Sequence, residues 1–438
     1  MEKIQSIKGT RDFYPEEMAV RNWLFDGWRA ASLRNGFVEY DSPIFEYLQL
    51  YTAKSGDEIA GQLFSLTDRG GRELAIRPET TPSLARMVNQ RINSLPRPIK
   101  WFSVSRLCRA ERPQKGRLRE FFQWNTDIIS DSAYEYADAD CIYTAVDYLR
   151  SVGLTKDDIV VKISSRAMLA DLLRSQGFTD DQLPTVYSLL DKQPKIPPDK
   201  FTTVAEEQIP DTNLREKLMR LQSVDSLGEL KEFASDSAKN SIEPLETLFY
   251  LLDRMGIADY CEFDINIVRG LAYYTGMVFE IFDRRSRLRA VCGGGRYDNL
   301  LAGLGGPSVP AVGFGMGDVV LEILLREKNL LDSAKNTLDF FVVYDDYKTF
   351  EDKGLALVDN LRERGFSTAF DYRRTSAMSK QLKLASAQNT RFAVILGRET
   401  IDLYEITLKN MADGSQKRIA IKDFLKETDN YEFQRRPL

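Results

Sequence analysis

The sequence contains no histidine among its 438 residues, and this absence narrows the chemistry open to the protein. Ser-His-Asp hydrolysis, proton transfer through imidazole and His-ligated zinc are all excluded. Phosphoryl and nucleotidyl transfer remain, because they depend on positioning and charge neutralisation. Arginine, carboxylates, tyrosine and backbone amides can supply both.

Cysteines and long apolar runs are also scarce. The cysteines are far apart and form no paired metal spacing; they are Cys108, Cys141, Cys261 and Cys292. Reduced thiols in a cytoplasmic protein are therefore expected, without protein-bound zinc. No run approaches the length of a membrane span, and residues 1–4 do not open a signal peptide, so we expect no membrane partner.

A cationic loop is the most informative segment that the sequence does contain. It separates two strand-like runs, 101–108 and 121–129, and has a Pro and a Gly at its turn. Its five cations fall within eleven residues and are Arg109, Arg112, Lys115, Arg117 and Arg119. Such a block usually lies on a solvated face, but the flanking runs predict a hairpin with a shared polar face.

The two runs of this hairpin would present matched side chains. Because strand side chains alternate between faces, Arg109 and Glu111 share a face on the first run. The corresponding face of the second run carries Phe121, Gln123, Asn125 and Asp127. With these faces aligned, one surface offers cations, an aromatic plate, an amide and a carboxylate. That set suits a nucleotide and an amino acid bound side by side.

Three other segments are ambiguous when each is taken alone. Residues 77–81 (Arg-Pro-Glu-Thr-Thr) are typical of a capped helix start, and residues 268–276 of a packed loop with a surface arginine. Residues 292–298 place three glycines at a strand-to-helix junction, which is often only a tight turn. On one strand-rich scaffold, the three together indicate a ligand site.

The order of elements predicts an α+β fold with more than one domain. We expect a first domain over residues 1–328 with a helical insertion at about 165–255. A linker at 329–336 and a small α/β domain at 337–438 follow. The net charge of −5 means that any nucleic-acid partner must be met by a local basic patch.

Local patterns predict several element boundaries. We expect a helix over 15–35, a hairpin from 63–66 to 73–76, and a strand over 263–267. Thr81 is expected to cap the helix that Pro82 begins. In the last domain, strands are expected at 338–343, 367–370 and 391–396, with helices at 350–364 and 377–385.

The motifs together resemble those of histidyl-tRNA synthetases, a family of class II aminoacyl-tRNA synthetases. The similarity extends over nearly the full length, through residues 9–12, 77–81, 109–127, 269–280 and 293–298. It implies an antiparallel catalytic sheet flanked by helices and a C-terminal anticodon-binding domain. It also implies a homodimer built through the first helix and the strand at Pro43. The implied substrates are L-histidine, ATP with Mg²⁺ and the histidine-specific tRNA.

The resemblance also implies roles for individual residues. Arg109 and Arg269 would contact the α-phosphate from two sides as the catalytic cations, with Phe121 stacked on adenine. The ATP-binding set would be Arg109, Glu111, Arg117, Arg119 and Phe121. The histidine-binding set would be Glu79, Thr80, Thr81, Gln123, Asp127, Tyr273 and Tyr274. Arg112 and Gln114 would face the tRNA acceptor end. Exposed cations near the anticodon stem would be Arg373, Arg374, Lys380 and Lys383.

Two positions depart from the family pattern. Ala272 stands where the family usually has Asp, and Val320 stands where its third motif has an Arg. Arg296 is one cation that could substitute for the missing Arg, and Asp318 is expected to cap the following helix.

The missing Arg keeps alternatives open. One is a catalytically silent paralogue that regulates ATP phosphoribosyltransferase in histidine biosynthesis, and another is a sensor of uncharged tRNA. The intact arginines of the motifs and the C-terminal domain favour the active ligase. A related threonine enzyme is disfavoured, because its zinc site needs His.

Overall fold

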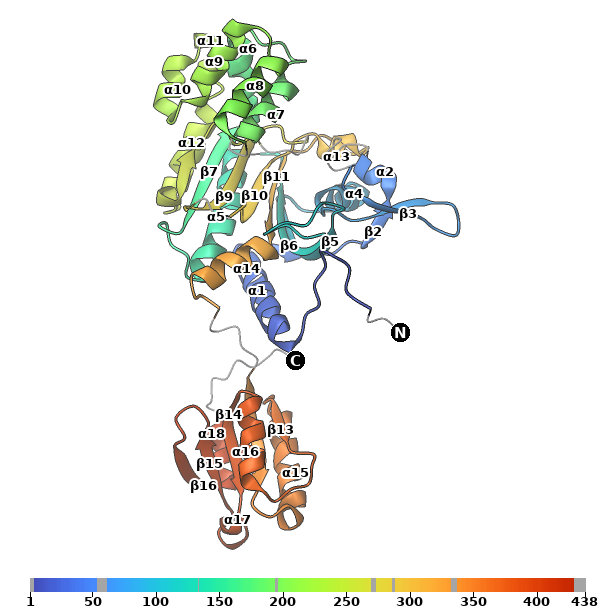
Figure 1. Cartoon of the computed structure of the whole chain (residues 1–438), viewed down its shortest axis with the longest axis vertical. Helices are drawn as coiled ribbons and strands as arrows, with labels where there is room; N and C mark the ends of the chain where they lie inside the picture. The colour runs from blue at the N-terminus through green and yellow to red at the C-terminus, as the bar shows by residue number, and fades with distance from the viewer. Residues whose placement is uncertain are drawn as a thin grey trace. The chain divides into compact units, whose positions relative to one another are not determined.

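The computed structural model describes residues 4–52, 61–132, 134–193, 196–268, 273–285, 288–331 and 337–428. The chain divides into two compact units, Met1–Ser333 and Ala334–Leu438 (Figure 1). Part of the expected linker, residues 332–336, lies outside the described residues, so its limits stay a prediction.

The first unit is organised around a large sheet. In the described part of the chain this sheet has eight strands in the order β1-β5-β6-β11-β10-β9-β7-β8. All neighbours are antiparallel except the parallel pairs β1–β5 and β7–β8. The strands are β1 (Val38–Glu39), β5 (Ile99–Cys108), β6 (Glu120–Ile129), β7 (Ile159–Ser165), β8 (Cys261–Phe263), β9 (Met277–Asp283), β10 (Cys292–Arg296) and β11 (Ala311–Gly317).

Helices α1 (Pro15–Arg34) and α5 (Tyr134–Ser151) pack against one face of this sheet. Trp28 of α1 and Tyr148 of α5 are fully buried against Trp124 of β6, with ring centroids 6.3 and 5.4 Å from the Trp124 ring. Trp124 also donates its indole N–H to the Ser32 hydroxyl at 2.8 Å. Because strand side chains alternate, the neighbours of Trp124 on β6 face the opposite side, where the candidate site lies.

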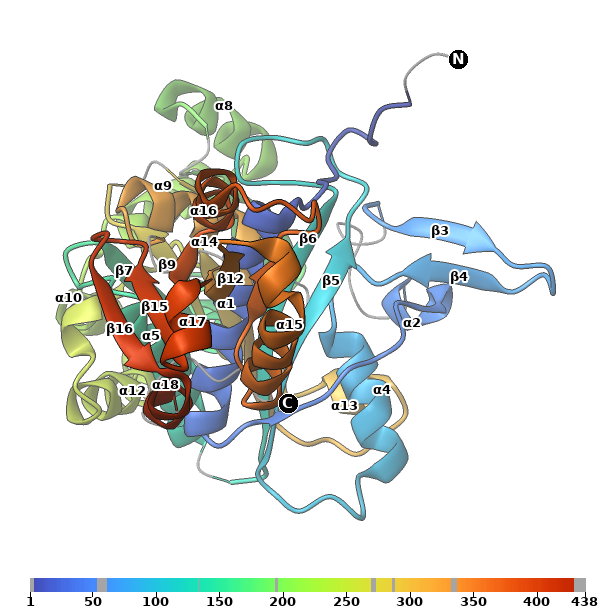
Figure 2. The same ribbon diagram turned by 90° about the horizontal axis from the view of Figure 1, so that it is seen from below.

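A smaller sheet extends from the first unit. It has the order β2-β4-β3 and contains β2 (Phe45–Tyr47), β3 (Phe64–Thr67) and β4 (Glu73–Ile76), with α2 (Leu48–Thr52) beside it. The β3–β4 hairpin projects away from the large sheet in both views (Figures 1 and 2). Its turn is closed by Asp68, whose Oδ1 accepts from the backbone N–H groups of Gly70 and Arg72, each at 2.9 Å.

The chain between β7 and β8 is helical and forms a group beside the sheet (Figure 1). Its elements are α6 (Arg166–Ser175), α7 (Leu183–Lys192), α8 (Pro198–Gln208), α9 (Thr212–Gln222), α10 (Leu227–Phe233), α11 (Asp236–Lys239), α12 (Glu243–Arg254) and η2 (Ala258–Tyr260). Side chains of Ser165, Asp211 and Ser226 each accept from a backbone N–H in the first turn of α6, α9 and α10. These caps explain why the helices begin where they do.

Three more helices are described in the first unit. They are α4 (Thr81–Arg91), α13 (Leu300–Gly303) and α14 (Asp318–Glu327). Two local predictions need correction here. The N-cap of α4 is Thr80, so Thr81 is already the first helical residue. The strand expected over 263–267 ends at Phe263, because Asp264 turns the chain by accepting the Asn266 N–H at 3.0 Å.

The second unit is an α/β domain with a mixed sheet of order β13-β12-β14-β15-β16. Strands β13, β12 and β14 run parallel, and β15 and β16 add antiparallel. Its strands are β12 (Leu338–Tyr344), β13 (Thr368–Phe370), β14 (Thr390–Leu396), β15 (Glu405–Asn410) and β16 (Gln416–Ala420). Its helices are α15 (Tyr347–Glu363), α16 (Met378–Ala387), α17 (Arg398–Asp402) and α18 (Ile421–Thr428). Phe340, Phe366 and Phe424 belong to its hydrophobic core. The α+β class predicted from the sequence is confirmed.

Candidate active site

A pocket opens on the face of the large sheet opposite α1 and α5. Glu79 and Thr81 reach it from the start of α4, and Gln123 and Asn125 reach it from β6. The pocket is also lined by Arg109, Tyr273, Tyr274, Tyr297 and Phe314. Segments far apart in the sequence therefore meet where the motifs predicted a ligand site. A larger open cavity of about 680 Å³ lies beside β8, around the Lys162–Asp264 ion pair.

Glycines on the neighbouring strands make the room in this pocket. In the sheet register, Gly313 of β11 stands opposite Asp127 of β6. A Cβ on Gly313 would lie 2.3 Å from Asp127 Oδ1, and one on Gly315 would lie 2.6 Å from Gln123 Nε2. Any larger residue would collide with a predicted histidine-binding side chain. This close approach is a steric reason for glycine at positions 313 and 315 of β11.

Asp127 is a buried carboxylate with one oxygen engaged. It is 2% exposed, and the Tyr297 hydroxyl donates to its Oδ1. Among the described residues, Oδ2 has no hydrogen-bond partner. Burial raises the pKa of Asp127 to about 7, while the hydrogen bond from Tyr297 opposes this and the charge of Glu79 adds to it. A buried acceptor oxygen of this kind is stabilised by a ligand that brings an N–H group.

Glu79 forms a second buried carboxylate site on the same face. It is buried, and the Tyr273 hydroxyl donates to its Oε2 at 2.7 Å. Burial and the charge of Glu79 hold the pKa of Tyr273 well above its usual value, so this phenol keeps its proton and donates. The rings of Tyr273 and Tyr297 meet edge to face, 5.8 Å apart, which joins the two carboxylate sites.

The cationic loop begins where β5 ends, at Cys108. Arg109 donates from Nε to the Pro78 carbonyl oxygen at 3.0 Å, and its guanidinium lies 5.3 Å from the centroid of the Phe121 ring. Glu111 forms an ion pair with Arg117, and its carbonyl oxygen accepts from Arg119 Nε at 3.1 Å. The two strands therefore do pair as a hairpin that brings cations beside an aromatic ring.

The remaining predicted residues fall into three groups. Thr80 is buried at the N-cap of α4. Arg112 and Gln114, expected to face the tRNA, are exposed at the tip of the loop. Arg269 and Ala272 lie outside the described residues, so the convergence of Arg269 with Arg109 stays a prediction.

Comparison with known proteins shows what this site resembles. Residues 9–318 match the family model described as "Histidyl-tRNA synthetase", and residues 339–430 match an anticodon-binding domain. A histidine–tRNA ligase of Opitutus terrae is 38% identical, covering 97% of this chain and 99% of the relative. The chloroplastic/mitochondrial enzyme of Arabidopsis thaliana is 39% identical over 95% of this chain and 85% of its own length. This chain belongs to the histidyl-tRNA synthetase family.

The solved structures agree on the fold. A histidyl-tRNA synthetase from Nostoc sp. PCC 7120 superposes with a TM-score of 0.84 at 23% identity, over 98% of this chain and all of the other. A Bacillus halodurans structure titled as an ATP phosphoribosyltransferase regulatory subunit/histidyl-tRNA synthetase gives 0.74 at 22% identity, over 90% of this chain and 99% of its own. The resemblance and fold class inferred from the sequence are confirmed.

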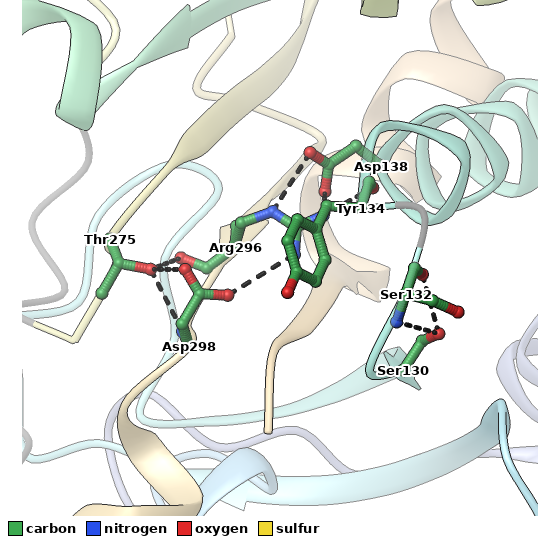
Figure 3. Close-up of polar contacts among 7 residues, drawn as sticks. All are labelled: Ser130, Ser132, Tyr134, Asp138, Thr275, Arg296 and Asp298. Carbon is green, nitrogen blue, oxygen red and sulfur yellow. Dashed lines mark hydrogen bonds and ion pairs between the residues drawn. The ribbon is translucent and has the colours of Figure 1, made fainter. Parts of the chain in front are cut away.

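Tyr297 is the residue of the site that sequence reasoning missed. It lies within the histidyl-tRNA synthetase motif at 293–298, where it was assigned no role, and it donates to Asp127. The signal was present in the sequence, because Gly293, Gly295 and Tyr297 share one face under strand alternation. The same alternation places Arg296 on the other face. Arg296 is there held by Asp138 and Asp298 (Figure 3), so the idea that it substitutes for the missing third-motif Arg finds no support.

The third-motif segment of this family member is built around Asp318. Asp318 is 1% exposed, accepts the Phe122 N–H at 2.9 Å and forms an ion pair with Arg11 at 2.6 Å. It is the first residue of α14, whose N-cap is Gly317. The expectation that Asp318 caps α14 was therefore wrong. Its carboxylate instead joins the N-terminal segment to the start of β6.

Two further observations bear on cofactors and surroundings. Within the described residues, no cluster of three or more His, Cys, Asp or Glu side chains could hold a metal ion. No helix in the described part of the chain combines the length and apolar character that crossing a membrane requires.

Proposed function

We propose that this chain attaches L-histidine to its tRNA in an ATP-dependent ligase reaction through a histidyl-adenylate intermediate. The observation that carries the substrate assignment is Asp127, a buried carboxylate with one oxygen left for a ligand. A buried acceptor beside phenols suits an imidazole, which brings an N–H donor and, on its other nitrogen, an acceptor. Membership of the histidyl-tRNA synthetase family supports the same reaction.

In this proposal the histidine is held at both ends. Glu79, Thr81 and Gln123 receive the α-amino group, because Glu79 is buried and offers negative charge. Asp127 and Tyr274 bind the two imidazole nitrogens. A wrong side chain would leave these buried groups unpaired, which gives strong discrimination.

The first chemical step needs cations more than a base. The histidine carboxylate is already ionised, so it attacks the α-phosphorus of ATP directly and pyrophosphate leaves. ATP enters with Mg²⁺ as the substrate complex, and its adenine stacks on Phe121. Arg109 and Arg269 would neutralise the charge that builds on the α-phosphate. Arg117 and Arg119 would meet the pyrophosphate end, and the ion pair between Arg117 and Glu111 must then loosen.

In the second step a terminal ribose hydroxyl of the tRNA attacks the carbonyl carbon of the adenylate, and AMP leaves. Arg112 and Gln114 are exposed on the loop and suit the acceptor end. In the second unit, Lys380 and Lys383 are exposed, while Arg373 is engaged by Asp371 at 2.8 Å. The two lysines are therefore the stronger candidates for phosphate contacts near the anticodon.

We also propose a homodimer. The edge strand β1 has only two residues, and Val38 on it is 62% exposed. Phe45 and Tyr47 of β2 are 54% and 58% exposed. Large apolar side chains exposed along one segment are typical of a surface that a partner covers. We further propose a cytoplasmic location and the domain limits 1–328 and 337–438.

ATP–pyrophosphate exchange with each amino acid in turn tests the function. Exchange with histidine alone is expected. Arg109→Gln should lower the rate about a hundredfold or more, because it removes a preorganised cation. Arg150→Gln, at an exposed arginine on the last turn of α5, is the matched control and should leave the rate unchanged. Exchange with another amino acid, or with none, would overturn the proposal.

One alternative has an observation in its favour. Val320 stands where the family carries a cation, which a catalytically silent regulator of ATP phosphoribosyltransferase would tolerate. The matched anticodon-binding domain at 339–430 favours the ligase. An absence of exchange combined with binding to that enzyme would favour the regulator.

A further inference from the structure

A buried polar network lies on the other face of β10, behind the candidate histidine pocket. Arg296 donates to Asp138 of α5 through Nε at 3.2 Å and through Nη2 at 2.8 Å. Its Nη1 reaches Asp298 at 3.4 Å, and the Thr275 hydroxyl donates to the other oxygen of Asp298 at 2.7 Å. Figure 3 shows Arg296 between the two carboxylates, with Thr275 beyond Asp298. We call these four residues the Arg296 network.

The network is attached to two of the three tyrosines that line the pocket, Tyr274 and Tyr297. Arg296 directly precedes Tyr297, whose hydroxyl donates to Asp127. Thr275 directly follows Tyr274, and its backbone N–H donates to the Arg296 carbonyl oxygen at 2.8 Å. The Thr275 hydroxyl also accepts the Asp298 N–H at 3.1 Å. These contacts therefore fix the backbone next to Tyr274 and next to Tyr297.

Two glycines leave the space that this arrangement needs. A Cβ on Gly276 would lie 2.8 Å from Arg296 Cδ, and one on Gly295 would lie 2.9 Å from Tyr274 Cδ1. Arg166 of α6 anchors the same segment from the other end, with its backbone N–H on the Gly276 carbonyl at 2.9 Å and Nη1 on the Tyr274 carbonyl at 3.3 Å. The segment 274–276 is held on both sides.

Burial explains why the network holds a fixed geometry. Arg296 and Asp138 are 8% and 5% exposed. Neither charge can leave its partner for water without a large penalty, so the pair has one arrangement and not several. A purely stabilising pair would need no contact with residues beside the pocket. A purely stabilising role for Arg296 and Asp138 does not explain the link through Asp298 to Thr275.

We propose that the Arg296 network positions Tyr274 and Tyr297 for the histidine side chain, with Thr275 as the positioning residue closest to the pocket. This inference rests on the proposed function. The network touches no substrate itself; it sets where two phenols stand relative to Asp127. Loss of the Thr275 hydroxyl should therefore weaken histidine recognition while adenine and phosphate binding, on the loop and Phe121, continue.

Thr275→Val, which removes the hydroxyl and keeps the shape, is the central test. Pyrophosphate exchange is measured while histidine and ATP are varied separately. We expect the KM for histidine to rise about tenfold, as the loss of one fixed hydrogen bond implies, with the KM for ATP changed by no more than about twofold. Thr275→Ser, which restores a hydroxyl, should return the KM for histidine to near the wild-type value.

Thr144→Val is the control, because the Thr144 hydroxyl donates within its own helix, to the Asp140 carbonyl at 2.8 Å, and among the described residues no other side-chain hydrogen bond is seen for it. It should leave both KM values unchanged. Asp298→Ala should resemble Thr275→Val, and thermal unfolding shows whether either variant is folded. Calorimetric titration with histidine alone gives a second measurement of the same effect.

The outcomes separate this inference from the proposed function. If the wild-type chain shows no exchange with histidine, the function itself fails. If it exchanges but Thr275→Val has an unchanged KM for histidine, the positioning role is refuted and the ligase stands. A rise of both KM values together, or failure of Thr275→Ser to restore recognition, also refutes the positioning role.

Discussion

Asp127→Asn changes one oxygen of the proposed histidine site to an amide and almost nothing in its volume. Oδ1 of Asp127 accepts from Tyr297, and Oδ2 has no hydrogen-bond partner among the described residues; in the proposal it is Oδ2 that accepts from the histidine. The phenol must still donate in the variant, because burial, the largest cause of the raised pKa of Tyr297, remains when the charge of Asp127 is removed. The amide oxygen of the variant therefore stays with Tyr297, and its NH₂ group faces the imidazole N–H.

The expected loss follows from the strength of that contact. A hydrogen bond to a charged acceptor contributes about 1.5–3 kcal/mol, which corresponds to roughly a 10- to 150-fold change in affinity. Because the variant places a donor against a donor, the upper part of this range is expected for the KM of histidine. The KM for ATP should change little, since Phe121 and the loop arginines are untouched.

The pKa of Asp127, raised to about 7 by burial, adds a pH signature. Below pH 7 the carboxyl binds a proton, so the wild type loses its charged acceptor and its KM for histidine rises as the pH falls. Above pH 7 the carboxylate is ionised and the KM levels off. The variant has no such step. Free histidine titrates near pH 6.5 in both experiments. The ratio of the variant's KM for histidine to the wild-type KM for histidine therefore isolates the effect of Asp127. This ratio should shrink as the pH falls from 8 to 6.

Pyrophosphate exchange from pH 6 to 8, with each substrate varied in turn, provides the measurement. Asp131→Asn is the matched control, because Asp131 is exposed and pairs with Arg97 at 2.7 Å on the surface. A ratio that stays constant with pH would refute the assignment of Asp127 as the imidazole acceptor. An equal rise of the KM for histidine and the KM for ATP in Asp127→Asn would also refute it.

Two further predictions follow from steric and electrostatic contacts. Gly313→Ala places a Cβ 2.3 Å from Asp127 Oδ1, so it should raise the KM for histidine in the exchange assay, whereas Gly317→Ala, with open space around its Cβ, should not. Arg11→Ala should lower the free energy of unfolding by about 2–4 kcal/mol in urea denaturation, because it leaves Asp318 charged and buried. Burial already raises the pKa of Asp318 and Arg11 opposes this, so the variant should regain stability as the pH falls toward 4; a loss that is independent of pH would contradict the reasoning.

Strand alternation made part of the site predictable from the sequence. Gln123 and Asp127 were expected on one face of β6 because a period of two needs no knowledge of distant contacts. The partner of Asp127 was not predictable in the same way. Tyr297 follows β10, which is separated from β6 by β11, and strand order is decided by pairing over long sequence distances.

Charged residues were the least predictable from sequence alone. Arg296 was named as one cation that could substitute for the missing third-motif Arg, yet it is paired with Asp138, 158 positions away along the chain. Asp318 was expected to cap its own helix, a local interaction, and instead binds the backbone of Phe122. In both cases tertiary burial decided the partner, because a buried charge must find an opposite charge or a donor wherever the fold brings one near.

The departure at Val320 acquires a physical meaning from these contacts. At the start of α14, Arg11 forms an ion pair with Asp318 at 2.6 Å and lies 3.9 Å from Glu322. Arg11 itself therefore adds little net positive charge there. In the proposed reaction, neutralisation of the triphosphate then falls to the arginines of the cationic loop and to Arg269. Arg117 forms an ion pair with Glu111 in the structure. Separating that pair would therefore reduce the net binding free energy of ATP. In the proposed reaction, ATP must separate Arg117 from Glu111, whereas Arg109 already lies beside Phe121, the proposed adenine platform.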